Sequence, residues 1–182
     1  MSPASPFSSS ARTRASLIAR LGRATRANRV RRNHALEHAA ISVITERHPN
    51  VFLRGRSNSK GFYIFGEVDT EELKSAIEEA LRRLKLGEVE LAIHPRCGTN
   101  LAVAGIMSGL ASALAAQLKP RQNRYSYAIL ASLASLMVAP TVGTATQRHL
   151  TTLADLGDLQ VESVERRRFL RDSAHWVRTR ST

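Results

Sequence analysis

The spacing of apolar residues predicts one amphipathic helix in the middle of the chain. Asp69 or Thr70 is placed to cap it, and two acidic residues follow in its first turn, where the helix dipole favours negative charge. We expect the helix to end near Gly87. Its apolar residues recur with a period of about 3.6 and are Leu73, Ile77, Ala80, Leu81 and Leu84.

Short β-type patterns surround this helix. Before it, two runs, 51–54 and 62–65, flank a Gly- and Ser-rich segment that reads as a turn or long loop. After it, Val89, Leu91 and Ile93 alternate with polar or small residues, which predicts a half-buried strand that Pro95 closes. Near the C-terminus, 159–164 and 175–178 predict two late strands around a charged turn, with Trp176 as their anchor in the core.

Two long segments contain no charged residue. Residues 101–118 and 125–147 are joined by a short polar loop with three basic residues. Helices of these lengths can cross a hydrocarbon core of about 30 Å, so we expect a transmembrane hairpin. Gly105 and Gly109 form a small-xxx-small pattern that allows close helix contact. A soluble helical hairpin buried in a dimer is the alternative.

The basic charge is concentrated at the N-terminus. The net charge is +12, and residues 1–36 hold eight Arg and no acidic residue. We interpret residues 1–32 as a disordered and basic amphipathic arm that suits an anionic lipid surface. The arm has no aromatic residues interleaved with its arginines, which argues against nucleic acid as a partner. An organelle transit peptide remains an alternative interpretation.

One short motif points to metal chemistry. His34, Glu37 and His38 form an H-x-x-E-H pattern. If residues 33–46 are helical, the i, i+4 spacing places both histidines on one face with Glu37 beside them. Two neutral imidazoles can then ligate a divalent cation, while Glu37 stays available as a base toward a bound water. The alternative is a helix end with two solvated histidines.

Cys97 is the only cysteine, so it cannot form a disulfide within the chain. We expect a reducing compartment. The thiol is either a small buried hydrophobe, the usual fate of a single cysteine, or a metal ligand. His94, three residues earlier, is a rival ligand or a group that supports the ligands.

The order of these landmarks resembles the S-ribosylhomocysteine lyase (LuxS) family and the fold that it shares with H-x-x-E-H metallopeptidases. The resemblance covers about residues 33–100 and includes the pentad, Gly61-Phe62-Tyr63 and Cys97-Gly98-Thr99. It implies His34, His38 and Cys97 as metal ligands and Glu37 as the acid/base. The family's second catalytic cysteine is replaced by Asn58, so the resemblance does not extend to the lyase reaction.

We therefore expect an α+β fold, with a small antiparallel sheet packed against helices. Residues 33–100 and 148–182 would form a metal-site domain, and residues 101–147 would form the inserted hairpin. The function that we expect is a membrane-anchored, metal-dependent hydrolase, with a peptidase as one form, using zinc or alternatively iron. The alternative is a non-catalytic membrane protein for assembly or binding. We expect the globular part on the cytoplasmic side of the membrane. The resemblance also leaves a homodimer as one possible oligomeric state.

Overall fold

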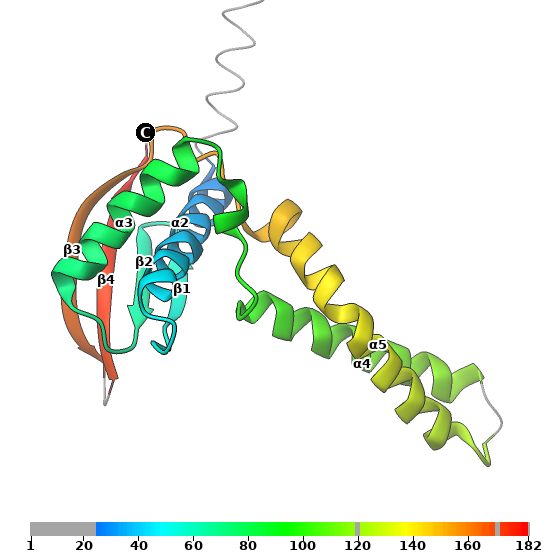
Figure 1. Ribbon diagram of the computed structural model, residues 1–182. Coiled ribbons are helices and arrows are strands. Elements are labelled where there is room, and N and C mark those ends of the chain that lie inside the picture. The colour runs from blue at the N-terminus through cyan, green and yellow to red at the C-terminus, as the bar shows by residue number, and fades with distance from the viewer. Residues whose placement is uncertain (1–24, 119–120, 170–171, 182) are drawn as a thin grey trace, which may run out of the picture.

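The computed structural model describes residues 25–118, 121–169 and 172–181. Within these ranges the fold is α+β, with a compact part built on a sheet and a long helical hairpin that projects from it (Figure 1). The compact part contains α2 (Arg26–Arg47), β1 (Arg54–Asn58), β2 (Gly61–Phe65), α3 (Thr70–Lys85), β3 (Gln160–Phe169) and β4 (Asp172–Arg180). The hairpin consists of α4 (Gly98–Leu118) and α5 (Arg124–Thr146).

The sheet is antiparallel and has the strand order β1-β2-β4-β3. Helices α2 and α3 lie over one of its faces (Figure 1). The core lies between these layers, because Phe62 and Ile64 alternate toward the helices and are fully buried. From the helices, Leu36 of α2 and Leu73 of α3 close the same core. The small antiparallel sheet packed with helices is thus confirmed.

The amphipathic helix α3 is confirmed almost to the residue. The Asp69 carboxylate accepts hydrogen bonds from the backbone N–H groups of Glu71 and Glu72, so it is the capping residue. Ile77 and Leu84 face the core as the periodicity requires. This helix was predictable because its signals are local.

The strand expected at Val89–Ile93 is wrong. Residues Val89–Ala92 form a 3-10 helix, η1, in which Leu91 and Ile93 donate backbone hydrogen bonds to residues three positions earlier. The chain turns at Gly87 with φ of +97° and packs η1 against α2. The alternation over five residues was compatible with a strand, but no strand pairs with this segment in the described chain.

β1 lies later than expected. The sequence favoured Val51–Arg54 as the strand and residues 55–61 as a turn, whereas Arg54–Asn58 is the strand and only Ser59 and Lys60 connect it to β2. Position 55 is a glycine because β1 lies against α2, where a Cβ at that position would overlap the Glu37 carboxylate.

The boundary of the N-terminal arm also differs from the expected one. α2 begins at Arg26 instead of Asn33, and the Thr25 side chain caps it. Arg32 is 1% exposed and donates from its guanidinium to the carbonyl of Asp155, so part of the arginine cluster is structural. Residues 1–24, on which the disorder and lipid-surface predictions mostly rest, lie outside the described residues.

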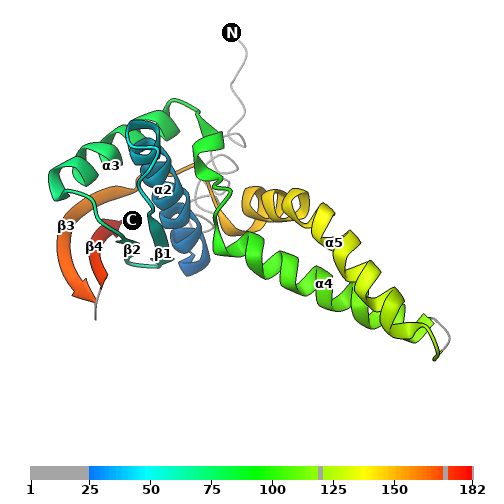
Figure 2. The ribbon, with the colours of Figure 1, turned by 60° about the horizontal axis from the view of Figure 1, so that its bottom comes forward.

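The two charge-free segments form two long helices, as expected. α4 and α5 pack against each other and extend away from the sheet in both views (Figures 1 and 2). Both helices are long and apolar enough to cross a membrane. None of the α4 side chains is buried, and Leu101, Ile106 and Leu110 are more than half exposed.

The two late strands are confirmed and are longer than predicted. Trp176 is 6% exposed, but its place differs from the expected one. Because Val177 faces the helices, the alternation of β4 puts Trp176 on the opposite face of the sheet. There its ring lies 4.5 Å from the ring of Tyr63. It therefore anchors the outer face instead of the main core.

Candidate metal centre

The helix α2 presents its two histidines on one face, one turn apart. The ring centroids of His34 and His38 are 4.2 Å apart. His38 is buried, at 2% exposed, whereas His34 is half-buried. The i, i+4 geometry expected from the sequence is therefore present.

Each imidazole is oriented by a backbone carbonyl. His34 Nδ1 lies 3.0 Å from the carbonyl oxygen of Thr151, and His38 Nδ1 lies 2.8 Å from that of Ala92. A carbonyl oxygen has no proton to give, so each Nδ1 must be the donor. In the neutral imidazole this leaves the Nε2 lone pair available, which is the arrangement that metal-binding histidines use.

Cys97 completes the cluster from a distant part of the chain. Its Sγ lies 3.4 Å from His34 Nε2, and the candidate ligand atoms of His34, His38 and Cys97 all lie within 4.8 Å of one another. Burial opposes ionisation of the Cys97 thiol, but the hydrogen bond and positive charge of His38 in its protonated form, with the Thr99 N–H, outweigh it and lower the pKa of Cys97. The surroundings therefore favour a thiolate, the form that binds metals.

The loop that carries Cys97 is held by hydrogen bonds of Gln147 and Asn100, which we call the polar clasp. The Gln147 side chain is fully buried, accepts a hydrogen bond from the His94 N–H at 3.0 Å and donates to Asn100 Oδ1 at 2.7 Å. Asn100 also donates to the carbonyl of Pro95 at 2.9 Å. A Cβ at Gly143 would overlap Asn100, so glycine allows α5 to approach the clasp. The base of the hairpin and the cysteine loop thus form one unit.

Glu37 lies beside the cluster and is 3% exposed. Its carboxylate accepts a hydrogen bond from the Ser57 hydroxyl of β1. Burial raises the pKa of Glu37 to about 7, although the Ser57 hydrogen bond and the charge at His34 act in the opposite direction. A carboxyl group with such a pKa can exchange a proton near neutral pH.

His94, the rival ligand, is not brought into the cluster. Its ring centroid is 5.8 Å from that of His38, and its Nδ1 accepts a hydrogen bond from the Arg96 N–H at 3.3 Å. Burial, with positive charge at His38 and Arg96, lowers the pKa of His94 to about 4. His94 therefore stands next to the ligands as a neutral imidazole.

Asn58 occupies the place of the resembled family's second cysteine and has a structural use here. Its carbonyl oxygen accepts a hydrogen bond from Asn33 of α2, and its side chain accepts one from the Lys60 N–H in the β1–β2 turn.

Several contributors were not found from the sequence. Ser57, Asn100 and Gln147 are separated by many residues from the groups that they contact, and the carbonyls of Ala92 and Thr151 carry no side-chain signal. Asn100 stands just before the charge-free segment 101–118, where nothing local indicates its contact with Gln147.

The three side chains could together hold a metal ion. In a tetrahedral zinc site, with about 2.0 Å to imidazole nitrogen and about 2.3 Å to thiolate sulfur, the ligand atoms lie roughly 3.3–3.5 Å apart. The 3.4 Å between His34 Nε2 and Cys97 Sγ agrees with this spacing, and all three candidate ligand atoms lie within 4.8 Å of one another.

The chain matches one protein family and a related protein whose descriptions state no activity. The family model described as "Domain of unknown function (DUF6391)" matches residues 29–164. An uncharacterized protein of Picosynechococcus sp. is 36% identical over 162 residues, which cover 83% of this chain and 79% of that protein. No solved structure matches the chain. The matched region includes most of α2, Cys97 and the whole hairpin.

Proposed function

Since this chain belongs to the family of the DUF6391 domain, its activity has to be argued from its own site, and we propose that it is a membrane-anchored, metal-dependent hydrolase. A peptidase is the form that the resemblance of the pentad to H-x-x-E-H metallopeptidases favours. One observation carries the proposal: two imidazoles with anchored Nδ1 atoms and one thiol converge beside a buried carboxyl group.

The chain's own residues would divide the work. His34, His38 and Cys97 would hold the ion, with zinc preferred for this donor set and iron as the alternative. Such an ion supplies Lewis acidity toward water and a carbonyl oxygen. Glu37 would accept a proton on its carboxylate and return it to the leaving group, which its burial and hydrogen bond to Ser57 suit.

The hairpin supports a position at a membrane. α4 has no buried residue, and its 21 residues extend about 32 Å at 1.5 Å per residue, which matches a hydrocarbon core. Cys97 directly precedes α4, so a membrane-spanning hairpin would put the metal centre at the bilayer surface. We propose that the globular part faces the cytoplasm.

The test compares metal content with activity in the purified full-length protein. We expect about one metal per chain in the parent and in Glu37→Gln, and a loss of metal in His38→Ala and Cys97→Ala. Hydrolysis of an unstructured protein such as casein should fall by at least about a hundredfold in Glu37→Gln. His149→Ala is the matched control, because this histidine is exposed and lies outside the cluster. A parent without stoichiometric metal would remove the proposal.

A second function is favoured by the contact between Glu37 and Ser57. This hydrogen bond ties α2 to β1, so the carboxylate also has a structural use, and the protein would then serve membrane assembly or binding on a metal-stabilised scaffold. In that case metal removal would melt the domain, while Glu37→Gln would leave the cellular function intact.

A further inference from the structure

The globular part exposes two large apolar side chains next to the base of the hairpin. Phe52, in the loop between α2 and β1, is 61% exposed. Leu150, in the helical turn η2 (Gln147–Thr151) that follows α5, is 68% exposed. Neither residue belongs to the metal cluster or to the core. Single exposed apolar residues are ordinary on a protein surface, so their position relative to the hairpin decides what they can contact.

Phe52 is tied to the start of α4 by Arg96. The guanidinium carbon of Arg96 lies 5.8 Å from the centroid of the Phe52 ring, which is within cation–π range. Arg96 is exposed and stands two residues before Gly98, where α4 begins. Its guanidinium forms no ion pair within the described part of the chain. Asn100 donates to the carbonyl of Pro95 at 2.9 Å, which fixes the loop that carries Arg96 to the first turn of α4.

Leu150 lies at the same end of the hairpin. The Gln147 side chain, at the start of η2, donates at 2.7 Å to Asn100 Oδ1 in the first turn of α4. Leu150 follows Gln147 by three residues, which is roughly 5 Å or less along a helix axis. The carbonyl of His149 accepts a hydrogen bond from Arg31 of α2 at 2.9 Å, so η2 is also fixed to the globular part.

Three segments of the chain therefore bring exposed side chains to the base of the hairpin. We call these side chains the collar: Phe52, Arg96 and Leu150. The helices that leave the collar carry no charge over residues 101–118 and 125–147. If they cross a bilayer, their bases lie where the hydrocarbon core meets the phospholipid headgroups. That zone accepts aromatic rings and arginine, whose stem can lie along apolar surface while its guanidinium donates to phosphate.

We propose that the collar docks on phospholipid headgroups. The Phe52 ring and the Leu150 side chain enter the boundary between headgroups and acyl chains, and the Arg96 guanidinium donates to lipid phosphate. The proposal rests on the membrane-spanning hairpin proposed above, and it does not depend on metal or on hydrolysis. Because Arg96 directly precedes Cys97, this contact holds the cysteine loop at the depth of the headgroups.

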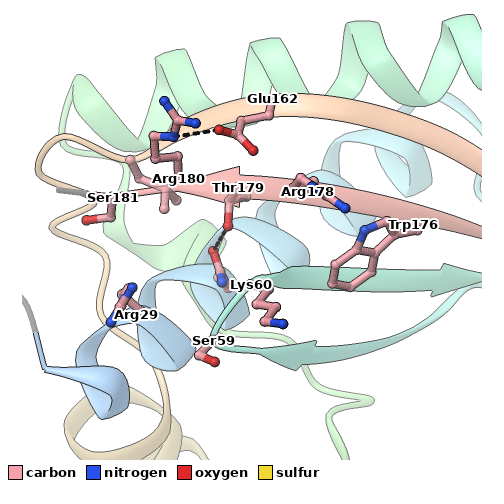
Figure 3. Close-up of a pocket in the computed structure, with 11 residues that line it drawn as sticks. Arg29, Ser59, Lys60, Glu162, Trp176, Arg178, Thr179, Arg180 and Ser181 are labelled. Atoms are coloured by element: carbon pink, nitrogen blue, oxygen red, sulfur yellow. Dashed lines mark hydrogen bonds and ion pairs between the residues drawn. The ribbon is translucent and has the colours of Figure 1, made fainter.

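The experiment introduces tryptophan at the collar and measures its quenching by labelled lipids. The full-length protein is reconstituted in vesicles of phosphatidylcholine and phosphatidylglycerol that carry either a nitroxide on the headgroup or bromine in the middle of the acyl chains. Trp176, labelled in Figure 3, is the only native tryptophan and is 6% exposed, so it supplies the same background in every variant. We expect Phe52→Trp and Leu150→Trp to lose fluorescence to the headgroup nitroxide beyond the loss in the parent.

Three further variants calibrate the measurement. Leu86→Trp is the matched control, because Leu86 is 69% exposed but directly follows α3, on the other side of η1 from the cysteine loop. It should be quenched like the parent. Leu110→Trp, in the middle of α4, should lose fluorescence mainly to the acyl-chain bromine. Arg96→Gln added to Phe52→Trp should reduce the quenching by the headgroup nitroxide. These positions are all exposed, so the substitutions leave the fold intact.

The outcomes separate the collar from the hairpin. If Leu110→Trp is quenched while Phe52→Trp and Leu150→Trp behave like Leu86→Trp, the hairpin spans the bilayer without the collar touching it, and the proposal is overturned. If Leu110→Trp is not quenched either, the membrane-spanning premise has failed and the proposal falls with it. Neither result bears on metal content or hydrolysis, which are measured separately.

Discussion

The side chains of the metal cluster are held by groups of the backbone and of neighbouring elements. The carbonyls of Thr151 and Ala92 fix the rings of His34 and His38, and the Thr99 N–H points at Cys97 Sγ. These contacts select the proton position on each ring and favour the thiolate, so the donors would be oriented before an ion bound. At the residue scale, the site therefore depends on hydrogen bonds and close contacts between neighbouring groups.

One close contact near the cluster is that between Gly55 of β1 and the carboxylate of Glu37. Gly55→Ala would place a Cβ on the Glu37 carboxylate, and we expect it to lower the free energy of unfolding by about 1–3 kcal/mol through overpacking. Gly105→Ala is the control, since nothing lies within 4 Å of a Cβ at that position. Denaturant unfolding measures both, and equal stability of the two variants would contradict the observed contact.

A second residue-scale prediction concerns pH. His175 is fully buried and its Nε2 lies 3.0 Å from Thr70 Oγ1. Burial, then positive charge at Arg166, lowers the pKa of His175, although Asp69 and Glu67 act in the opposite direction. The unfolded chain therefore takes up this proton at higher pH than the folded chain, and the contribution of His175 to stability falls as the pH drops below about 6.5.

The measurement compares unfolding midpoints of the chelator-treated protein at pH 7.5 and pH 5.5. Glu37, whose pKa is raised to about 7, acts in the opposite direction in both proteins, so the prediction concerns their difference. On going from pH 7.5 to pH 5.5, the parent should lose stability relative to His175→Asn, which cannot ionise. His149→Asn serves as the control, because His149 is exposed, whereas His48 pairs with Glu72. The same pH dependence in His175→Asn and the parent would show that the buried imidazole does not cause it.

At the scale of elements, the cluster is assembled by segments that meet only in the folded chain. α2 brings the histidines, while the loop between η1 and α4 brings Cys97. The clasp formed by Gln147 and Asn100 fixes that loop to the base of the hairpin. The hairpin therefore has a role in positioning the thiol as well as a length that suits a membrane.

We expect Gln147→Leu to weaken zinc binding about 10- to 100-fold, the range for partners that orient metal ligands. The substitution removes the acceptor of the His94 N–H and the donor to Asn100, which frees the cysteine loop. Zinc affinity measured by competition with a chelating dye provides the readout. The control is Gln160→Leu, which alters an exposed glutamine of β3. Unchanged affinity in Gln147→Leu would mean that the loop holds its position without the clasp.

The parts that the sequence predicted are those with local signals. Leu73 and Ile77 mark α3 through their spacing, and His34 and His38 share a face because four residues make about one turn. By contrast, η1 and the Gly- and Ser-rich β1 are decided by packing against α2, which no local pattern reports. For the same reason the partners of Glu37 and Cys97 could not be identified before the elements were placed.

At the scale of the molecule, the helical hairpin projects away from the part that contains the sheet (Figure 2). Leu110 and Leu133 are 60% and 57% exposed. Exposure of these apolar side chains is unfavourable in water and favourable in lipid. The hairpin interior also has polar contacts, since the hydroxyls of Ser108 and Ser132 share a hydrogen bond. Such bonds between helices are common in membrane spans.

Membrane insertion should therefore be sensitive to charge on the hairpin. Leu110→Arg with Leu133→Arg should release the protein from membranes during alkaline carbonate extraction, because each arginine near a helix centre costs about 2.5–3.5 kcal/mol. Leu86→Arg, at an exposed position next to α3, should leave the protein in the pellet. If the parent itself is extracted by carbonate, the hairpin does not span a bilayer and a soluble helical hairpin is the better interpretation.

The most direct test of the metal centre is X-ray absorption at the zinc edge of the purified, zinc-loaded protein. The account predicts one sulfur at about 2.3 Å and two imidazole nitrogens at about 2.0 Å, with the sulfur contribution absent in Cys97→Ala. A zinc shell of oxygen and nitrogen only in the parent, or one that Cys97→Ala leaves unchanged, would contradict it.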